Sequence, residues 1–192
     1  MKKSLLFGIL LLFACRAENS KVLSKYWEIP AFQLVDQTGT PFESQKISGK
    51  ICIVDFFYST CPSTCPGLNS RLSSLHKRLE GNASVQLLSI STDPEKDTPA
   101  VLQEYAKRFG ADSRWLFLTG QKQLIYKLAN EGFKLSLTET PGAAEPITHS
   151  TKLILLDKNG WVRGFYDAIG EGAEGVEEKL LSDIKKLENE KK

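Results

Sequence analysis

The chain has 192 residues, with 25 Lys and Arg, 23 Asp and Glu, and a formal net charge of +2. Charges of both signs are interspersed, so the sequence predicts no basic surface and excludes nucleic acid as a partner. This length suits one domain with a sizeable core, and the sequence contains neither internal repeats nor a linker to a second domain.

The first 14 residues have the pattern of a signal peptide. Two lysines follow the initial methionine, and the apolar stretch Ser4–Phe13 is far shorter than the ~20 residues of a membrane span. Leu12–Cys15 resembles a bacterial lipobox, in which the cysteine becomes the lipidated N-terminus. The alternative is an ordinary signal peptide in which Cys15 has no special role.

These patterns divide the chain into three parts. We expect a signal peptide at 1–14, a lipid anchor and tether at 15–28, and one folded domain at 29–192. The protein is then exported to the bacterial cell envelope and anchored to a membrane by the lipid on Cys15.

Apolar runs alternate with leucine-rich helical patterns along the domain. Strands are expected at 32–36, 51–58, 85–90, 115–118, 133–137, 151–157 and 161–166, and helices at 68–79, 99–109, 121–131 and 176–187. This order predicts an α/β sandwich with a central mixed sheet flanked by helices. An N-terminal hairpin precedes it, and an inserted hairpin or loop precedes the His149 strand.

Cys61 and Cys65 stand between the buried strand predicted at 51–58 and the helix that follows. The positive end of a helix favours thiolate over thiol. If the turn is helical, the two sulfurs can reach one metal ion or each other. A purely structural disulfide, or two buried thiols, is the alternative. The position after a central strand indicates a thioredoxin-like fold, while Cys52, inside an apolar run, is expected to be an inert core thiol.

The chain has two histidines. His76 lies eleven residues after Cys65 in the same predicted helix, about 16 Å away, which is too far to share a metal ion. We interpret His76 as a surface or boundary residue. His149 ends an irregular loop just before a strand, a position that suits a ligand. The alternative is a histidine with only local hydrogen bonds, and the sequence alone does not show that it faces the cysteines.

Four motifs resemble those of the Sco/SenC copper-binding proteins. Phe57–Pro66, which contains both cysteines, resembles the signature of that family. Phe32–Gly39, Ser91–Pro99 and the pair His149-Ser150 resemble three further motifs in the same order and at similar spacing. The match extends from about Phe32 to the final helix, which is nearly the whole predicted domain, and the combination of four motifs makes the resemblance specific.

The resemblance implies a thioredoxin-like fold that binds copper through Cys61, Cys65 and the distant His149. It implies a role in assembling the binuclear copper centre of cytochrome c oxidase, by delivering copper or by reducing the cysteines of that centre. Asp93 and Asp97 match acidic loop positions near the family's site, and we consider them as groups that support the ligands.

The donor set suits copper on chemical grounds as well. Thiolates are soft ligands for Cu(I), and imidazole suits both oxidation states. Zinc accepts the same donors, so the resemblance, and not the donor type, is what favours copper. One residue departs from the family pattern: Thr148 stands where many relatives have an acidic residue, and a carboxylate there would help to orient the imidazole.

Two functions follow from these observations. The first is a membrane-tethered copper chaperone, whose partner is the copper-accepting subunit of cytochrome c oxidase or another copper protein. The alternative is a thiol–disulfide oxidoreductase or thiol peroxidase that uses Cys61 and Cys65, although thioredoxin-type sites have a C-x-x-C spacing. A redox-inert scaffold domain is the third and least specific interpretation.

Overall fold

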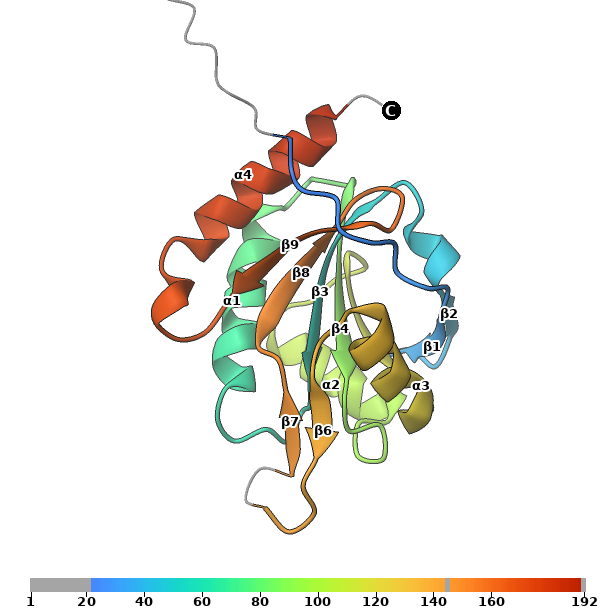
Figure 1. Cartoon of the computed structure of the whole chain (residues 1–192). Helices are drawn as coiled ribbons and strands as arrows, with labels where there is room; N and C mark the ends of the chain where they lie inside the picture. Colours follow the sequence, from blue (N-terminus) through green and yellow to red (C-terminus); the bar gives the residue numbers. More distant parts are fainter. Residues whose placement is uncertain (1–21, 144–145, 191–192) are drawn as a thin grey trace, which may run out of the picture.

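The computed structural model describes residues 22–143 and 146–190 (Figure 1). The predicted signal peptide, Cys15 and the first part of the predicted tether lie outside the described residues. Within the described ranges, no helix is both long and apolar enough to cross a membrane.

A seven-stranded mixed sheet forms the centre of the domain. Its strands lie in the order β2 (Pro41–Glu43), β1 (Gln33–Asp36), β5 (Trp115–Thr119), β4 (Val85–Ser91), β3 (Ile51–Phe57), β8 (Lys152–Leu156) and β9 (Val162–Asp167). The three middle strands β3, β4 and β5 are parallel, and β1 and β8 flank them in antiparallel orientation. Every residue of β3 and β4 is buried, as expected for strands covered on both faces.

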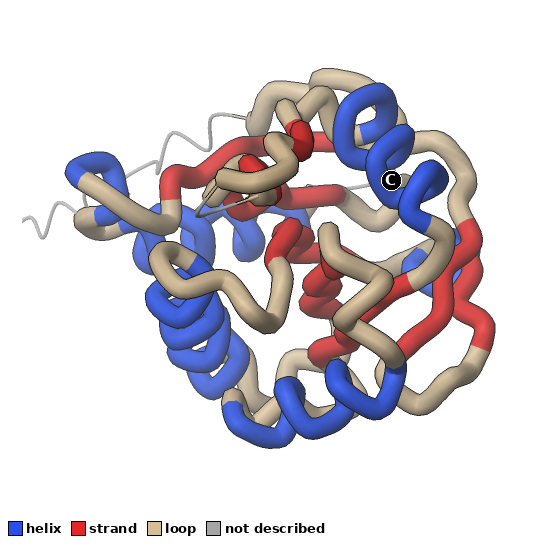
Figure 2. Tube along the Cα trace, turned by 90° about the horizontal axis from the view of Figure 1, so that it is seen from below, coloured by secondary structure: helices blue, strands red, loops and turns tan. Residues whose placement is uncertain are grey.

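Three helices pack together on one face of the sheet: α1 (Cys65–Arg78), α2 (Pro99–Arg108) and α4 (Val176–Asn189). Asn69 of α1 donates a hydrogen bond to the Tyr105 hydroxyl of α2 at 3.1 Å. Ser74 of α1 donates to Glu177 of α4 at 2.9 Å. Figure 2, which looks along the strands, shows helices on both sides of the sheet.

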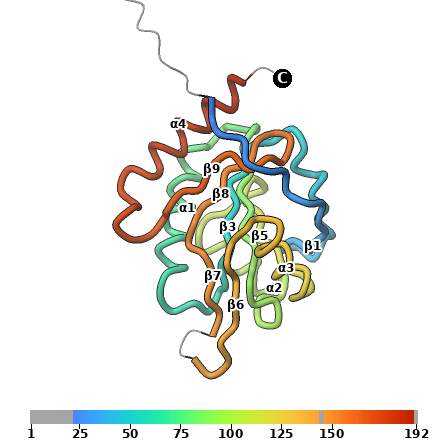
Figure 3. The backbone as a smooth tube through the Cα atoms, viewed as in Figure 1, coloured from blue at the N-terminus to red at the C-terminus, as the bar shows by residue number. Residues whose placement is uncertain are grey.

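The opposite face is covered by α3 (Lys122–Lys127) and the π-helical turn Leu128–Gly132 (Figures 1 and 3). Successive β3 side chains point to opposite faces. Phe57 therefore stacks on Tyr105 of α2 with ring centroids 5.3 Å apart, whereas Phe56 meets Phe133, just after the π-helical turn, at 5.4 Å. Two short 3₁₀ helices, Ser44–Ile47 and Glu171–Ala173, complete the secondary structure of the described residues. The predicted sandwich around a mixed sheet is confirmed.

The inserted hairpin differs in detail from its prediction. It consists of β6 (Leu137–Glu139) and β7 (Ile147–His149), which pair only with each other, and His149 is part of a strand. The sequence predicted a strand at 133–137 because apolar residues alternate there. Phe133 and Leu135 do bury their side chains, but their backbone N–H groups bond back to the π-helical turn and join no strand.

His76 was predicted at the surface or at a boundary, and this prediction is wrong. The residue is 5% exposed, its Nε2 lies 2.8 Å from Asp112 Oδ1, and its ring lies against Trp115 with centroids 5.7 Å apart. The connection between α2 and β5 covers this side of α1, so a residue beside the leucine stripe becomes buried.

The N-terminal segment of the described chain runs along β9. The Tyr26 N–H donates to the Val162 carbonyl at 3.0 Å, and the Val162 N–H donates to the Trp27 carbonyl at 2.8 Å. The buried guanidinium of Arg163 donates to the carbonyls of Leu23 and Ser24. Among the described residues, contacts with the domain are therefore present from residue 23 onward, inside the segment that the sequence assigned to the tether.

Candidate metal centre

The two cysteines lie where β3 passes into α1. The strand ends at Phe57, and α1 begins at Cys65. Cys61 lies in the turn between them, and its N–H donates to the Tyr58 carbonyl at 3.2 Å. Pro66 stands in the first helical turn, where an N–H has no partner inside the helix, so the proline ring removes no hydrogen bond. The predicted order of strand, turn and helix is therefore confirmed, with Cys61 just outside the helix.

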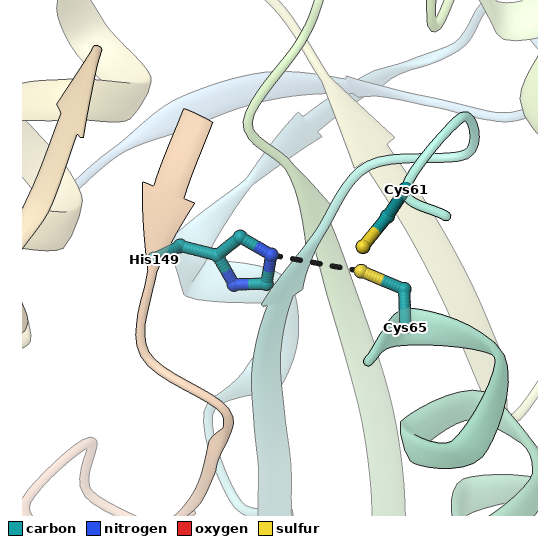
Figure 4. Close-up of side chains that lie close together, drawn as sticks. All are labelled: Cys61, Cys65 and His149. Carbon is teal, nitrogen blue, oxygen red and sulfur yellow. Dashed lines mark hydrogen bonds between the residues drawn. The ribbon is translucent and has the colours of Figure 1, made fainter. Parts of the chain in front are cut away.

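His149 joins the cysteines from a distant part of the chain. Its Nε2 lies 3.5 Å from the Cys65 sulfur, across 84 residues of sequence (Figure 4). The sulfurs of Cys61 and Cys65 and a ring nitrogen of His149 all lie within 4.8 Å of one another. Two atoms bound to one metal at about 2.0–2.3 Å can be up to about 4.6 Å apart. Only small side-chain movements would therefore place these three donors around one ion.

The hydrogen bond at the other ring nitrogen orients the imidazole. His149 Nδ1 lies 3.0 Å from the carbonyl oxygen of Ser150. A carbonyl only accepts, so Nδ1 carries the proton and Nε2 presents its lone pair to the sulfurs. The ring of Tyr58 packs edge-on at 5.7 Å. The Ser150 carbonyl thus orients the imidazole of His149. In relatives with an acidic residue at the position of Thr148, a carboxylate would help to do so.

The environments of the two thiols are opposite. Burial opposes the charged form of Cys61, but hydrogen bonds from the Cys65 and Ser63 backbone and from the Cys65 side chain outweigh it and lower the pKa of Cys61 to about 6. Burial raises the pKa of Cys65, and the neighbouring Cys61 raises it further. At neutral pH, Cys61 is therefore expected to be mainly a thiolate, whereas Cys65 remains a protonated thiol.

Cys52 lies apart from this pair. It is fully buried in β3 and is free, and burial raises its pKa to about 12. A thiol with so high a pKa remains protonated at neutral pH and reacts slowly. The prediction that Cys52 is a buried core residue is confirmed.

Asp97 supports the turn that precedes Cys61. Its carboxylate is fully buried and accepts hydrogen bonds from the Ser59 N–H at 3.0 Å, from the Ser59 hydroxyl, and from the Ser91 hydroxyl at 2.5 Å. It therefore connects the end of β4 to the chain two residues before Cys61. Ser59 has this role although the sequence analysis did not single it out.

Asp93 has a different environment. Its carboxylate pairs with the exposed Lys96 at 3.1 Å, and the Asp93 backbone carbonyl accepts from the Asp97 N–H at 2.8 Å. The largely buried side chain of Asp93 thus pairs with an exposed lysine, and its backbone shapes the loop that carries Asp97.

A buried carboxyl in β3 was missed by the sequence analysis. Asp55 is 1% exposed, and its Oδ1 accepts from the Ser89 hydroxyl at 2.5 Å. Burial raises the pKa of Asp55 to about 7, although the Ser89 hydrogen bond opposes this shift. The signal was visible, because Asp55 is the one charged residue in the otherwise apolar run from Ile51 to Tyr58.

Fold and site together define a protein with a cysteine–cysteine–histidine group at the end of a central strand. The family model described as SCO1/SenC matches residues 22–187. The chain therefore belongs to the SCO1/SenC family, and its fold is thioredoxin-like, as in solved structures of that family.

Three solved structures illustrate the likeness. A SCO1/SenC family lipoprotein from Bacillus anthracis str. Ames is 30% identical, with a TM-score of 0.77 and coverage of 85% of this chain and 96% of that one. Bradyrhizobium japonicum ScoI with copper bound is 25% identical, with a TM-score of 0.69 and coverage of 84% and 99%. BsSco, described as a member of the Sco family of cytochrome c oxidase assembly proteins with a disulfide switch, is 27% identical, with a TM-score of 0.75 and coverage of 89% and 98%.

Proposed function

We propose that this protein is a membrane-tethered copper chaperone that carries one copper ion on Cys61, Cys65 and His149. The observation that carries the proposal is the convergence of these three donor atoms within 4.8 Å of one another. The copper-bound ScoI structure, which has the same fold, supports the choice of metal. Copper is the cargo in this function and not a resident cofactor.

The site is suited to taking up and releasing the ion. Cys61 supplies a thiolate because the pKa of its thiol is low, and Cys65 releases its proton when copper binds. His149 contributes the Nε2 lone pair, since its proton is on Nδ1. Three donors leave room for a donor of the acceptor protein, which allows the ion to pass directly between the two sites.

The copper-accepting subunit of cytochrome c oxidase, or another copper protein, is the proposed acceptor. The description of BsSco as a member of a family of cytochrome c oxidase assembly proteins supports this assignment. The proposed location is the bacterial cell envelope, with a lipid on Cys15 holding the protein at a membrane. The similar Bacillus anthracis protein is itself described as a lipoprotein.

Metal analysis of the reduced protein after copper addition tests this function. We expect one copper per chain after removal of weakly bound metal, and transfer of that copper to an acceptor with an empty copper site. A parent protein that holds copper no more tightly than a simple dithiol would contradict the chaperone function.

A second function is favoured by the unequal thiols. Cys61 can attack a partner's disulfide, which releases one partner thiolate and leaves a mixed disulfide. The Cys65 thiol then loses its proton and attacks the Cys61 sulfur, which releases the second partner thiol. Two electrons pass to the partner, and the Cys61–Cys65 disulfide remains. Turnover of a disulfide substrate, or of peroxide with a thiol reductant, at an enzyme-like rate would establish this oxidoreductase or peroxidase function.

Replacing the proposed lipidation residue should release the protein from the membrane. Cys15→Ser is expected to abolish labelling by a fatty-acid probe and to move the protein from the membrane fraction to the soluble fraction. Each buried CH₂ of a lipid chain contributes about 0.8 kcal/mol to membrane binding, so loss of the whole lipid anchor should have a large effect. Cys52→Ala is the matched control. Acyl labelling that persists in Cys15→Ser would contradict the anchor.

Replacing Asp97 tests its support of the Cys61 turn. Asp97→Asn should lower the free energy of unfolding by about 1–3 kcal/mol, since an amide nitrogen cannot accept the hydrogen bonds that one carboxylate oxygen accepts. Copper affinity should fall about 10-fold, in the range seen when a ligand loses its supporting contacts. Asp93→Asn is the control, because its ion pair with an exposed lysine contributes about 0–1 kcal/mol. Equal copper affinities for the two variants would contradict this role.

A further inference from the structure

The hairpin that carries His149 is not part of the main sheet. Strands β6 and β7 pair only with each other, and Figure 1 shows the hairpin extending beyond the end of β3. The two cysteines, in contrast, are fixed by the central strand β3 and by α1. The position of His149 relative to the sulfurs therefore depends on the contacts that hold the hairpin to the domain.

The side chain of Asn130 forms hydrogen bonds with the backbone of the hairpin. Asn130 Nδ2 donates to the Leu137 carbonyl at 3.2 Å, and Asn130 Oδ1 accepts from the Leu137 N–H at 3.0 Å. The amide thus satisfies both backbone groups of one residue, as a neighbouring β-strand would. Leu137 is the residue directly opposite His149 in the β6–β7 register.

The backbone conformation before β6 places the Asn130 side chain within hydrogen-bonding distance of Leu137. Asn130 lies within the π-helical turn Leu128–Gly132, and its Nδ2 also donates to the Tyr126 carbonyl at 3.0 Å. Lys134, between this turn and β6, has a φ of 56°, the only positive φ outside glycine among the residues described. Such a conformation is unfavourable for lysine and persists only where surrounding contacts impose it.

Besides the burial of Leu137 and Ile147 in the core, an ion pair adds a further polar contact between the hairpin and the domain. Lys122 Nζ of α3 lies 2.5 Å from Glu139 Oε1, and Glu139 is the last residue of β6. The same Nζ lies 3.6 Å from Glu95, in the loop that leads to Asp97. Both contacts reach β6 from α3 and its π-helical continuation, on the face of the sheet opposite α1.

We propose that Asn130 is a positioning residue for His149, and that it acts through the backbone of Leu137. This proposal rests on the proposed function, because it assumes that His149 is a copper ligand. Asn130 itself is exposed and contributes no apolar surface to the core. Its contribution is to fix the hairpin at the register position from which the imidazole reaches the sulfurs.

The test is Cu(II) titration of Asn130→Ala, with electron paramagnetic resonance to detect nitrogen coupling from the imidazole. We expect Cu(II) affinity to fall about 10-fold and the nitrogen coupling to weaken, as when a ligand loses a supporting contact. Cu(I) affinity should change little, because two thiolates bind it. Asn82→Ala is the matched control, since the Asn82 amide also bonds through both its oxygen and its nitrogen, but to Ser84 and Glu188.

A double-mutant comparison shows whether Asn130 acts through His149. In a His149→Ala background, adding Asn130→Ala should change Cu(II) affinity by less than about 2-fold, because the residue through which it acts is already absent. Thermal unfolding checks that each variant is folded. Glu139→Gln, which removes only the ion pair, is a milder second variant and should show a smaller shift in the same direction.

The outcomes separate this proposal from the proposed function. If His149→Ala weakens Cu(II) binding but Asn130→Ala and Glu139→Gln leave affinity and nitrogen coupling as in the parent, the positioning role is wrong and the chaperone function stands. An equal effect of Asn130→Ala with and without His149 would also contradict the role. If the parent protein does not bind copper tightly, the proposed function itself fails.

Discussion

Changing either Cys61 or Cys65 to serine is expected to abolish tight copper binding. Loss of a ligand's supporting contact typically costs 10–100-fold in metal affinity, so loss of one of the two thiolates themselves should cost at least about 100-fold. Serine is nearly isosteric but presents a hard oxygen in place of a soft sulfur. Titration of the reduced variants with a Cu(I) competitor of known affinity measures the loss.

His149→Ala should affect the two oxidation states differently. Two thiolates remain to hold Cu(I), whereas Cu(II) loses its nitrogen donor and should bind far more weakly. His76→Gln is the control histidine variant. It should lower stability, because His76 is buried against Asp112, but leave copper binding unchanged. Weakened Cu(II) binding in His76→Gln, with normal binding in His149→Ala, would refute the ligand assignment.

The second large effect concerns the reactivity of the thiols as pH changes. The pKa of Cys61 is lowered to about 6, so the thiolate is present above that pH and is lost as pH falls through it. Alkylation of the metal-free, reduced protein should therefore have its midpoint near pH 6 and occur at Cys61. The raised pKa values of Cys65 and Cys52 keep both thiols protonated and slow to react at pH 7.

Mass mapping of the alkylated cysteine at each pH provides the measurement. After mild oxidation the same experiment should find a reversible Cys61–Cys65 disulfide, with Cys52 still a free thiol. Preferential labelling of Cys65, or a Cys61 midpoint near pH 9, would show that the hydrogen bonds at the turn do not stabilise the thiolate. A disulfide that contains Cys52 would contradict its placement inside β3.

Local features of the site could be predicted from the sequence. Cys61 and Cys65 are four residues apart, so the turn between an apolar strand and a helix brings them together without long-range information. The length of the predicted helix likewise showed that His76 lies too far from Cys65 for the two residues to share a metal ion. His149 was different, because its approach depends on a hairpin that joins it to the site across 84 residues of sequence. Its place before a strand suited a ligand, but only the family resemblance placed it beside the cysteines.

Other features were not predictable from local patterns. The burial of His76 results from the connection after α2, which covers this side of α1. The spacing of apolar residues within the helix does not indicate that contact. The two hydrogen bonds between the Asn130 amide and the Leu137 backbone depend on a π-helical turn. This turn continues an ordinary helical pattern and has no distinct sequence signal. The bond between Asp97 and Ser59 likewise joins two loops that are 38 residues apart.

Copper-edge X-ray absorption of the copper-loaded parent and of His149→Ala tests the central claim most directly. This measurement identifies the atoms bound to the metal without relying on affinity. We predict two sulfur ligands and one imidazole nitrogen in the parent, and loss of the imidazole signal in His149→Ala with both sulfurs retained. A parent site without sulfur, or an imidazole signal that is unchanged in His149→Ala, would contradict the assignment of Cys61, Cys65 and His149 as the copper ligands.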